Sequence, residues 1–204
     1  MGIFRRYEWR FKGYDFYYEI IWPEDLLSYL EEMDHSVKNT EDYSYYVFNE
    51  PFSEELVNFL NDLLELGSQY IEFEEKKEAL EYLLSFVQHL NYYRERGEYP
   101  RYPMETVIDG GGDCEDTAIL MAFICWQLGY DCAFLQFENE DSSGKGGWAH
   151  LDLGIAPQYS DEFSGSYWVG DDGTRYFYAS CNGRGYRIGE YSGNFGKWAK
   201  VYKL

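Results

Sequence analysis

The chain is poor in basic residues, and it has no long apolar run. Its 204 residues include 17 Lys and Arg against 37 Asp and Glu, a formal net charge of −20. A surface of this sign repels phosphates, which argues against nucleic acid and anionic lipid as partners. No segment approaches the roughly 20 consecutive apolar residues of a spanning helix, and residues 1–11 lack the apolar stretch of a signal peptide. We therefore expect a soluble chain without a membrane segment, with the cytoplasm as its default location.

Cysteine is scarce as well. Cys114, Cys125, Cys132 and Cys181 form no CxxC pair and no CxxC…HxxxH spacing. Those spacings hold structural zinc, so we expect no metal site, and reduced thiols are the simpler interpretation. Three disulfide connectivities stay open for an exported protein. With 45% apolar and 21% aromatic residues, the chain has enough apolar side chains for a hydrophobic core that is stable without disulfide bonds or a bound metal ion.

The first half of the chain predicts a hairpin and then helices. Aromatic and polar residues alternate on both sides of Gly13, which predicts a β-hairpin over residues 3–21. Helices are predicted over residues 23–33 and 53–66, and residues 68–93 form either one long amphipathic helix or two short ones. We expect loops over residues 34–42 and, because of its glycine and prolines, over residues 94–104.

The second half predicts one buried helix followed by strands. The sequence DGGGDCED over residues 109–116 places Asp113 as an N-cap and Asp116 three residues later, so a helix should run from Cys114 to Gly129. It is apolar almost all round, as in a fully buried helix. Strands are predicted over residues 130–137, 148–155, 175–181 and 186–188, with loops over 139–147 and 158–173. Helices followed by strands indicate an α+β protein with an antiparallel sheet on the central helix.

Cys114 is the first candidate for chemistry. Free N–H groups and the positive end of the helix dipole favour a thiolate, so we expect a lowered pKa unless the flanking Asp113, Glu115 and Asp116 point toward the sulfur. The preceding glycines let the backbone lie close to a substrate, and the Cys114 amide can donate to an oxyanion. The alternative is an ordinary core cysteine.

His150 is the second candidate. It lies in the predicted strand GGWAHLDLGI, on the same face as Asp152, which is either a partner that competes for the imidazole or an edge residue. A strand that crosses the buried helix can bring the imidazole to Cys114 and form the Cys–His pair of acyl transfer. The alternative is a buried histidine satisfied by its neighbours.

The run YPRYPMETVIDGGGDCEDTAILMAFICWQLGYD resembles the nucleophile segment of the transglutaminase-like cysteine peptidases, above all an archaeal and bacterial branch with a GDCED block. The similarity extends from about Ser85 to Glu190. It implies a papain-like α+β core over residues 53–204, with a flank of hairpin and helix over residues 1–52 packed on it. It also implies that Cys114 is the nucleophile and His150 the general base, acting without a cofactor on a peptide or protein substrate.

The third catalytic residue departs from that pattern. Similar sequences carry a glutamate that orients the histidine at the position of Ser180, and a serine accepts an N–H bond without bringing a charge. Asn182 is a candidate substitute, because papain-like enzymes orient their histidine with asparagine, and Asp171 and Asp172 are further options. Gln88 is a candidate oxyanion donor beside Cys114.

Three functions stay open at this point. The first is a thiol-dependent peptidase or amidase that works through an acyl-enzyme, either by hydrolysis or by transglutaminase-type transfer to an amine. The second is a catalytically impaired binding module that lacks the acidic triad member. The third is a structural surface protein whose acidity serves solubility in high salt.

Overall fold

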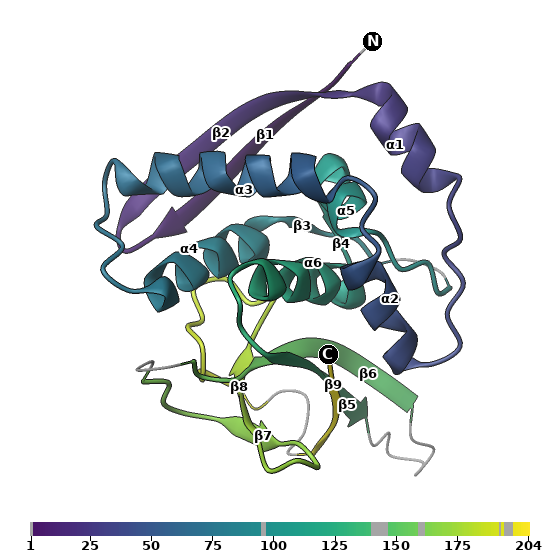
Figure 1. The fold of residues 1–204 in the computed structure, drawn as a ribbon, viewed down its shortest axis with the longest axis vertical. Coiled ribbons are helices and arrows are strands. Elements are labelled where there is room, and N and C mark those ends of the chain that lie inside the picture. Colours follow the sequence, from purple (N-terminus) through teal and green to yellow (C-terminus); the bar gives the residue numbers. More distant parts are fainter. Residues whose placement is uncertain (1, 95–96, 140–146, 159–161, 192, 194–197) are drawn as a thin grey trace.

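The structure is a computed structural model that describes residues 2–94, 97–139, 147–158, 162–191, 193 and 198–204. Three layers follow one another in Figure 1: a two-stranded hairpin, a middle layer of helices, and an antiparallel sheet. The amino terminus lies at the hairpin and the carboxyl terminus at the sheet. This is the mixed architecture of helices and antiparallel sheet that the order of predicted elements indicates.

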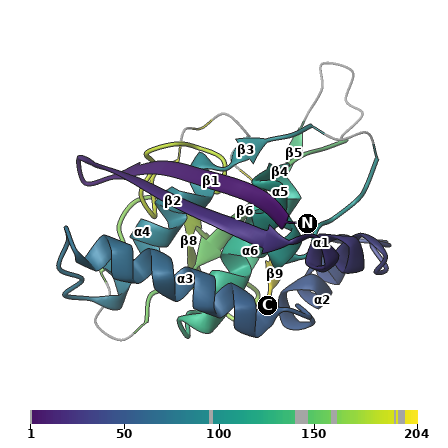
Figure 2. The ribbon, with the colours of Figure 1, turned by 90° about the horizontal axis from the view of Figure 1, so that it is seen from above.

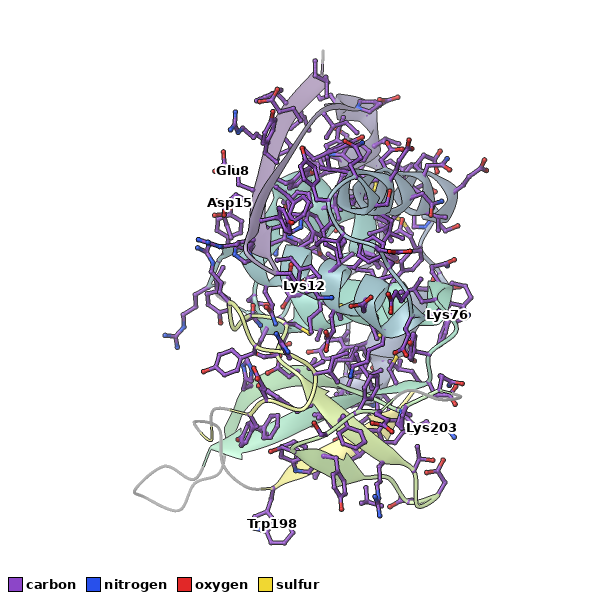
Figure 3. All side chains as sticks on the ribbon, turned by 90° about the vertical axis from the view of Figure 1, so that its left-hand side faces the viewer. Glu8, Lys12, Asp15, Lys76, Trp198 and Lys203 are labelled. Carbon is purple, nitrogen blue, oxygen red and sulfur yellow. The ribbon has the colours of Figure 1, made fainter. Side chains whose placement is uncertain are left out.

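The hairpin is formed by β1 (Gly2–Phe11) and β2 (Tyr14–Pro23), as predicted. Its two-residue turn holds Lys12 and Gly13 at positive φ, the conformation that continues the right-handed twist of the strands. Lys12 pairs with Glu78 of the helical layer. Figure 3 labels Lys12 where the end of the hairpin meets the helices, and the hairpin crosses over the helical layer when seen from above (Figure 2). The hairpin has four buried aromatic side chains on its inner face: Tyr7, Trp9, Phe16 and Trp22.

The predicted helices are confirmed, and three short helical elements were missed, of which Thr40–Asp42 lies in the loop that we expected over residues 34–42. Residues 68–93 contain one helix rather than two, and residues 103–109 are helical although we expected a loop up to residue 104. The helical elements are α1 (Glu24–Glu31), η1 (Thr40–Asp42), α2 (Tyr43–Phe48), α3 (Ser53–Ser68), α4 (Lys76–His89), α5 (Pro103–Asp109) and α6 (Cys114–Gln127).

The sheet has five strands in the order β7–β8–β6–β5–β9, and all neighbours are antiparallel. Three predicted strands are confirmed, but residues 186–188 form no strand, and β7 and β9 were not predicted. A separate parallel pair joins β3 (Asn91–Tyr92) to β4 (Gly111–Gly112) just before α6. The strands of the sheet are β5 (Cys132–Asn139), β6 (Gly147–Ile155), β7 (Tyr167–Val169), β8 (Arg175–Ala179) and β9 (Ala199–Lys203).

Helix α6 is the centre of the core. Residues 118–125 have no exposed surface, and Leu151, Leu153 and Ile155 of β6 pack in the same hydrophobic cluster. That cluster also contains Tyr7 and Trp9 of the hairpin, so residues 1–52 share their core with the rest of the chain. None of the helices within the described ranges is long and apolar enough to cross a membrane.

Candidate functional site

The start of α6 is fixed by a buried ion network. The Asp113 N–H donates to Asp116 Oδ2 over 3.0 Å, as in a capping box. Asp116 is fully buried, and burial together with the negative charge of Asp113 raises its pKa to about 6, against the lowering effect of Arg101. Arg101 donates to Asp116 Oδ2 over 2.7 Å and to Asp109 Oδ2 over 3.0 Å. These two acids of the DGGGDCED run therefore hold Arg101 and tie the preceding loop to the helix.

Two of the three glycines are required by close packing. A Cβ on Gly111 would overlap the backbone of Asn91 in β3, and a Cβ on Gly112 would overlap the Asp116 carboxylate. Gly111 also has a φ of +157°. Their hydrogens leave room for the β3–β4 pair, which places the backbone that leads into Cys114.

A cavity of about 500 Å³ opens in front of Cys114. The start of α6 lines it together with Gln136 of β5 and His150 and Leu151 of β6. Tyr92 and Arg94 form another part of the wall. The amino-terminal flank contributes residues 37–40 and Tyr43. The cavity therefore contains both residues that the sequence singled out for catalysis.

The Cys114 thiol is half-buried and points at an acid. Its Sγ donates to Glu115 Oε2 over 3.2 Å. Burial raises the pKa of this thiol well above its ordinary value, the negative charges of Glu115 and Asp113 raise it further, and the Leu151 N–H at the sulfur works against them. Glu115 points toward the sulfur, which is the case in which we expect no lowering of the thiol pKa, because the flanking acids and desolvation outweigh the dipole.

His150 is oriented by Asp152 from its own strand. Its Nε2 lies 2.6 Å from Asp152 Oδ2. Asp152 is fully buried, and it also accepts the Tyr178 hydroxyl and, over 2.8 Å, the N–H of Cys181. These donors from β8 and the turn after it hold the carboxylate in place.

Ser180 and Asn182 do not orient His150. The Ser180 hydroxyl accepts the Gly183 N–H over 3.0 Å in the turn after β8, and Asn182 Oδ1 accepts the Thr117 hydroxyl over 3.2 Å. The carboxylate that bonds the imidazole is Asp152. Both expectations are corrected, because Ser180 is engaged in the turn at Gly183 and Asn182 is bonded to Thr117 of α6. The sequence signal for Asp152 was its period-two spacing from His150.

Gln88 is not an oxyanion donor. Its Nε2 donates to the carbonyls of Ser180 and Tyr186 over 2.8 and 2.9 Å, and its Oε1 accepts the Gly185 N–H over 3.1 Å. The amide is buried and fully used in holding the 180–186 turn against α4. The expectation for Gln88 is therefore replaced by a structural role.

The other three cysteines add no catalytic candidate to the cavity. All four cysteines are free, and Cys125, Cys132 and Cys181 are buried. Over the residues that can be described, no three His, Cys, Asp or Glu side chains gather as they would around a metal ion. Among protein-family models, curated proteins and solved structures, none matches this chain.

Proposed function

We propose that this chain is a thiol-dependent hydrolase with a transglutaminase-like, papain-like core that cleaves a peptide or amide bond through an acyl-enzyme. The observation that carries the proposal is that His150, whose Nε2 lies 2.6 Å from Asp152 Oδ2, lines the same cavity as Cys114 at the start of α6. A nucleophile, a base and a residue that orients the base are the three parts that such chemistry needs.

In this proposal the proton leaves Cys114 during attack rather than before it, because the resting thiol is held protonated. His150 takes the proton from sulfur as the C–S bond forms and the carbonyl electrons move to oxygen. The intermediate collapses, the C–N bond breaks, and His150 returns the proton to the leaving amine. Water then adds to the thioester with His150 again as base, which releases the acid and the Cys114 thiol. Asp152 stabilises the imidazolium in both halves.

The proposal is tested with p-nitrophenyl acetate, which acylates a catalytic thiol without a matched leaving peptide. The acetyl adduct should map to Cys114 by mass spectrometry, and its rate of formation should fall strongly in His150→Ala but not in the histidine control His89→Ala. Selective labelling of Cys114 by itself proves little, since the other thiols are buried. If Cys114 acylates at the same rate with and without His150, the chain is a binding module rather than an enzyme.

A further inference from the structure

A second cavity, of about 400 Å³, lies apart from the one that holds Cys114. Its walls are the end of β1 with the hairpin turn, helix α4 with the residues just before it, and the turn at residues 185–187. Among the described residues, none lines both cavities. A cavity of this volume has room for a small organic ligand.

Ser85 of α4 carries a buried hydroxyl that the fold leaves without a bond. The residue lines this second cavity with 6% of its surface exposed, and its Oγ has no hydrogen-bond partner among the described residues. A buried hydroxyl without a partner lowers the stability of a fold. Glu81 lines the same cavity and lies one helical turn before Ser85. Residues four apart stand on the same face of a helix, so the carboxyl group and the hydroxyl share one wall.

Glu81 faces an arginine from another wall without pairing with it. Burial raises the pKa of Glu81, and the charges of Lys77 and Arg187 work against it. Within the described ranges, neither the Glu81 nor the Arg187 side chain has an ion pair or a hydrogen bond. Arg187 belongs to the turn that the Gln88 amide holds against the end of α4. Gln88 lies about 10 Å along the helix from Glu81, which leaves room for a ligand between Glu81 and the turn.

The other charged groups of this cavity are engaged or exposed. Glu74 and Glu75 are exposed to solvent before α4. Three more cations line the cavity and each has a partner: Lys12 with Glu78, Lys77 with the Glu162 carbonyl, and Arg10 with Asp15. An ammonium group bonds a carboxylate and a hydroxyl, and a guanidinium bonds a carboxylate. The ligand that satisfies Glu81, Ser85 and Arg187 together therefore carries both charges.

We propose that this second cavity binds a free α-amino acid, with its ammonium group on Glu81 and Ser85 and its carboxylate on Arg187. A ligand with a single charge would leave either Glu81 or Arg187 unpaired. Phe11 and Tyr186, which also line the cavity, offer contacts to an apolar side chain of the ligand. The site is separate from the cavity of Cys114, so this inference does not depend on the hydrolase proposal.

The test screens the twenty L-amino acids one at a time by thermal unfolding of the unaltered chain. At about 10 mM, an amino acid with a dissociation constant near about 1 mM should raise the melting temperature by about 3 °C. Calorimetric titration then compares the amino acid of largest effect with its methyl ester, which lacks the carboxylate, and its N-acetyl derivative, which lacks the ammonium group. Both derivatives should bind at least about tenfold more weakly.

Variants assign the binding to this cavity. Glu81→Gln and Arg187→Gln should each weaken binding about tenfold, and Ser85→Ala should weaken it less. In Arg187→Gln the methyl ester should bind as tightly as the amino acid, because the carboxylate has lost its partner. The control Arg184→Gln lies three residues earlier and lines a different cavity, so it should bind like the unaltered chain.

Three results would overturn the inference. The first is that none of the twenty amino acids raises the melting temperature. The second is a methyl ester or N-acetyl derivative that binds the unaltered chain as tightly as the amino acid does. The third is unchanged binding in Glu81→Gln and Arg187→Gln, since the amino acid would then bind elsewhere, for example in the cavity of Cys114. Acylation of Cys114 is a separate measurement, and neither result bears on the other.

Discussion

The buried Asp152 carboxylate accepts the Tyr178 hydroxyl and the Cys181 N–H, and it bonds the imidazole of His150. Donors from β8 and the following turn fix it from one side, and His150 lies two residues before it in β6. A carboxylate in this place can both select the tautomer of the ring and stabilise the imidazolium. The side chain that bonds the imidazole is thus on the histidine's own strand, and is neither Ser180 nor Asn182.

Replacing Asp152 by Asn should therefore strongly lower the rate at which Cys114 is acylated. The amide leaves no negative charge beside the imidazolium, and we expect the acylation rate of Cys114 to fall about 10²-fold or more. Ser180→Ala is the control, because Ser180 has a bond to Gly183 and reaches Asp152 only through the Tyr178 hydroxyl, and its rate should stay near that of the unaltered chain. Stopped-flow measurement of p-nitrophenol release checks both. If acylation slows in Ser180→Ala and not in the Asn variant of Asp152, then Ser180 rather than Asp152 orients the imidazole.

Glu115→Gln should make the thiol more reactive. Glu115 accepts the Cys114 S–H and raises the thiol pKa with its charge, so its neutral analogue lowers that pKa. If the pKa falls by one unit, the thiolate fraction and the alkylation rate at pH 8 rise about tenfold. The pH profile of iodoacetamide alkylation measures this. Glu98→Gln is a suitable control, since Glu98 lines the same cavity and bonds Tyr43 instead. Equal pH profiles of alkylation for Glu115→Gln and Glu98→Gln would contradict the role of Glu115 in raising the thiol pKa.

Residue chemistry was predictable where it depends on local sequence. A cysteine at a capped helix start and a histidine in an alternating strand are visible without a structure, and both line the cavity. The role of Gln88 was not predictable, because its partners lie 92 to 98 residues further along the chain. The direction of the thiol pKa shift depends on the side-chain rotamer of Glu115, which the sequence does not specify.

At the scale of elements, the β3–β4 pair determines where α6 begins. Gly112→Ala should destabilise the fold by about 1–3 kcal/mol, because a Cβ meets the buried carboxylate that holds Arg101. Gly129→Ala is the control: a Cβ there meets nothing within 4 Å, and its φ of +76° costs alanine only about 1–2 kcal/mol. Urea unfolding compares the two. A larger loss of stability in Gly129→Ala than in Gly112→Ala would show that the ion pair of Asp116 and Arg101 moves to make room for a Cβ at residue 112.

Elements were predictable from periodicity only where they are long. The hairpin, α3, α6, β5 and β6 each carry enough alternating or helical positions to be recognised. Helix α5 has seven residues between prolines and glycines, and β9 pairs with a strand some 60 residues earlier, so their sequences carry no sufficient local signal. Residues 186–188 looked like a strand, but the amide of Gln88 engages the backbone at Gly185 and Tyr186.

At the scale of the whole molecule, the three layers share one core and several acids lie inside it. Glu50 is 7% exposed and accepts the N–H groups of Phe52 and Met104 over 2.8 and 2.9 Å, which ties the end of the amino-terminal flank to α5. Burial raises the pKa of Glu50 to about 7, and burial likewise raises that of Glu105 to about 7. The surface charge of −20 adds repulsion that grows as carboxyl groups ionise.

These buried acids predict a fold that loses stability between pH 4.5 and 7. A carboxyl whose pKa is higher in the folded chain binds more protons there than in the unfolded chain, so the free energy of unfolding falls as pH rises through that window and levels off above it. For Glu50 the change from 4.5 to about 7 amounts to about 3 kcal/mol.

Urea unfolding at pH 5, 6.5 and 8 measures this loss. In about 0.5 M salt, repulsion between surface charges is screened while the contribution of the buried Glu50 remains. The free energy of unfolding should therefore still fall as the pH rises. Glu50→Gln should show a shallower fall because its amide does not titrate, although it loses one backbone bond and starts from lower stability at pH 5. Stability that rises from pH 5 to pH 8 in the unaltered chain would mean that these carboxyl groups are better solvated or paired than their burial implies.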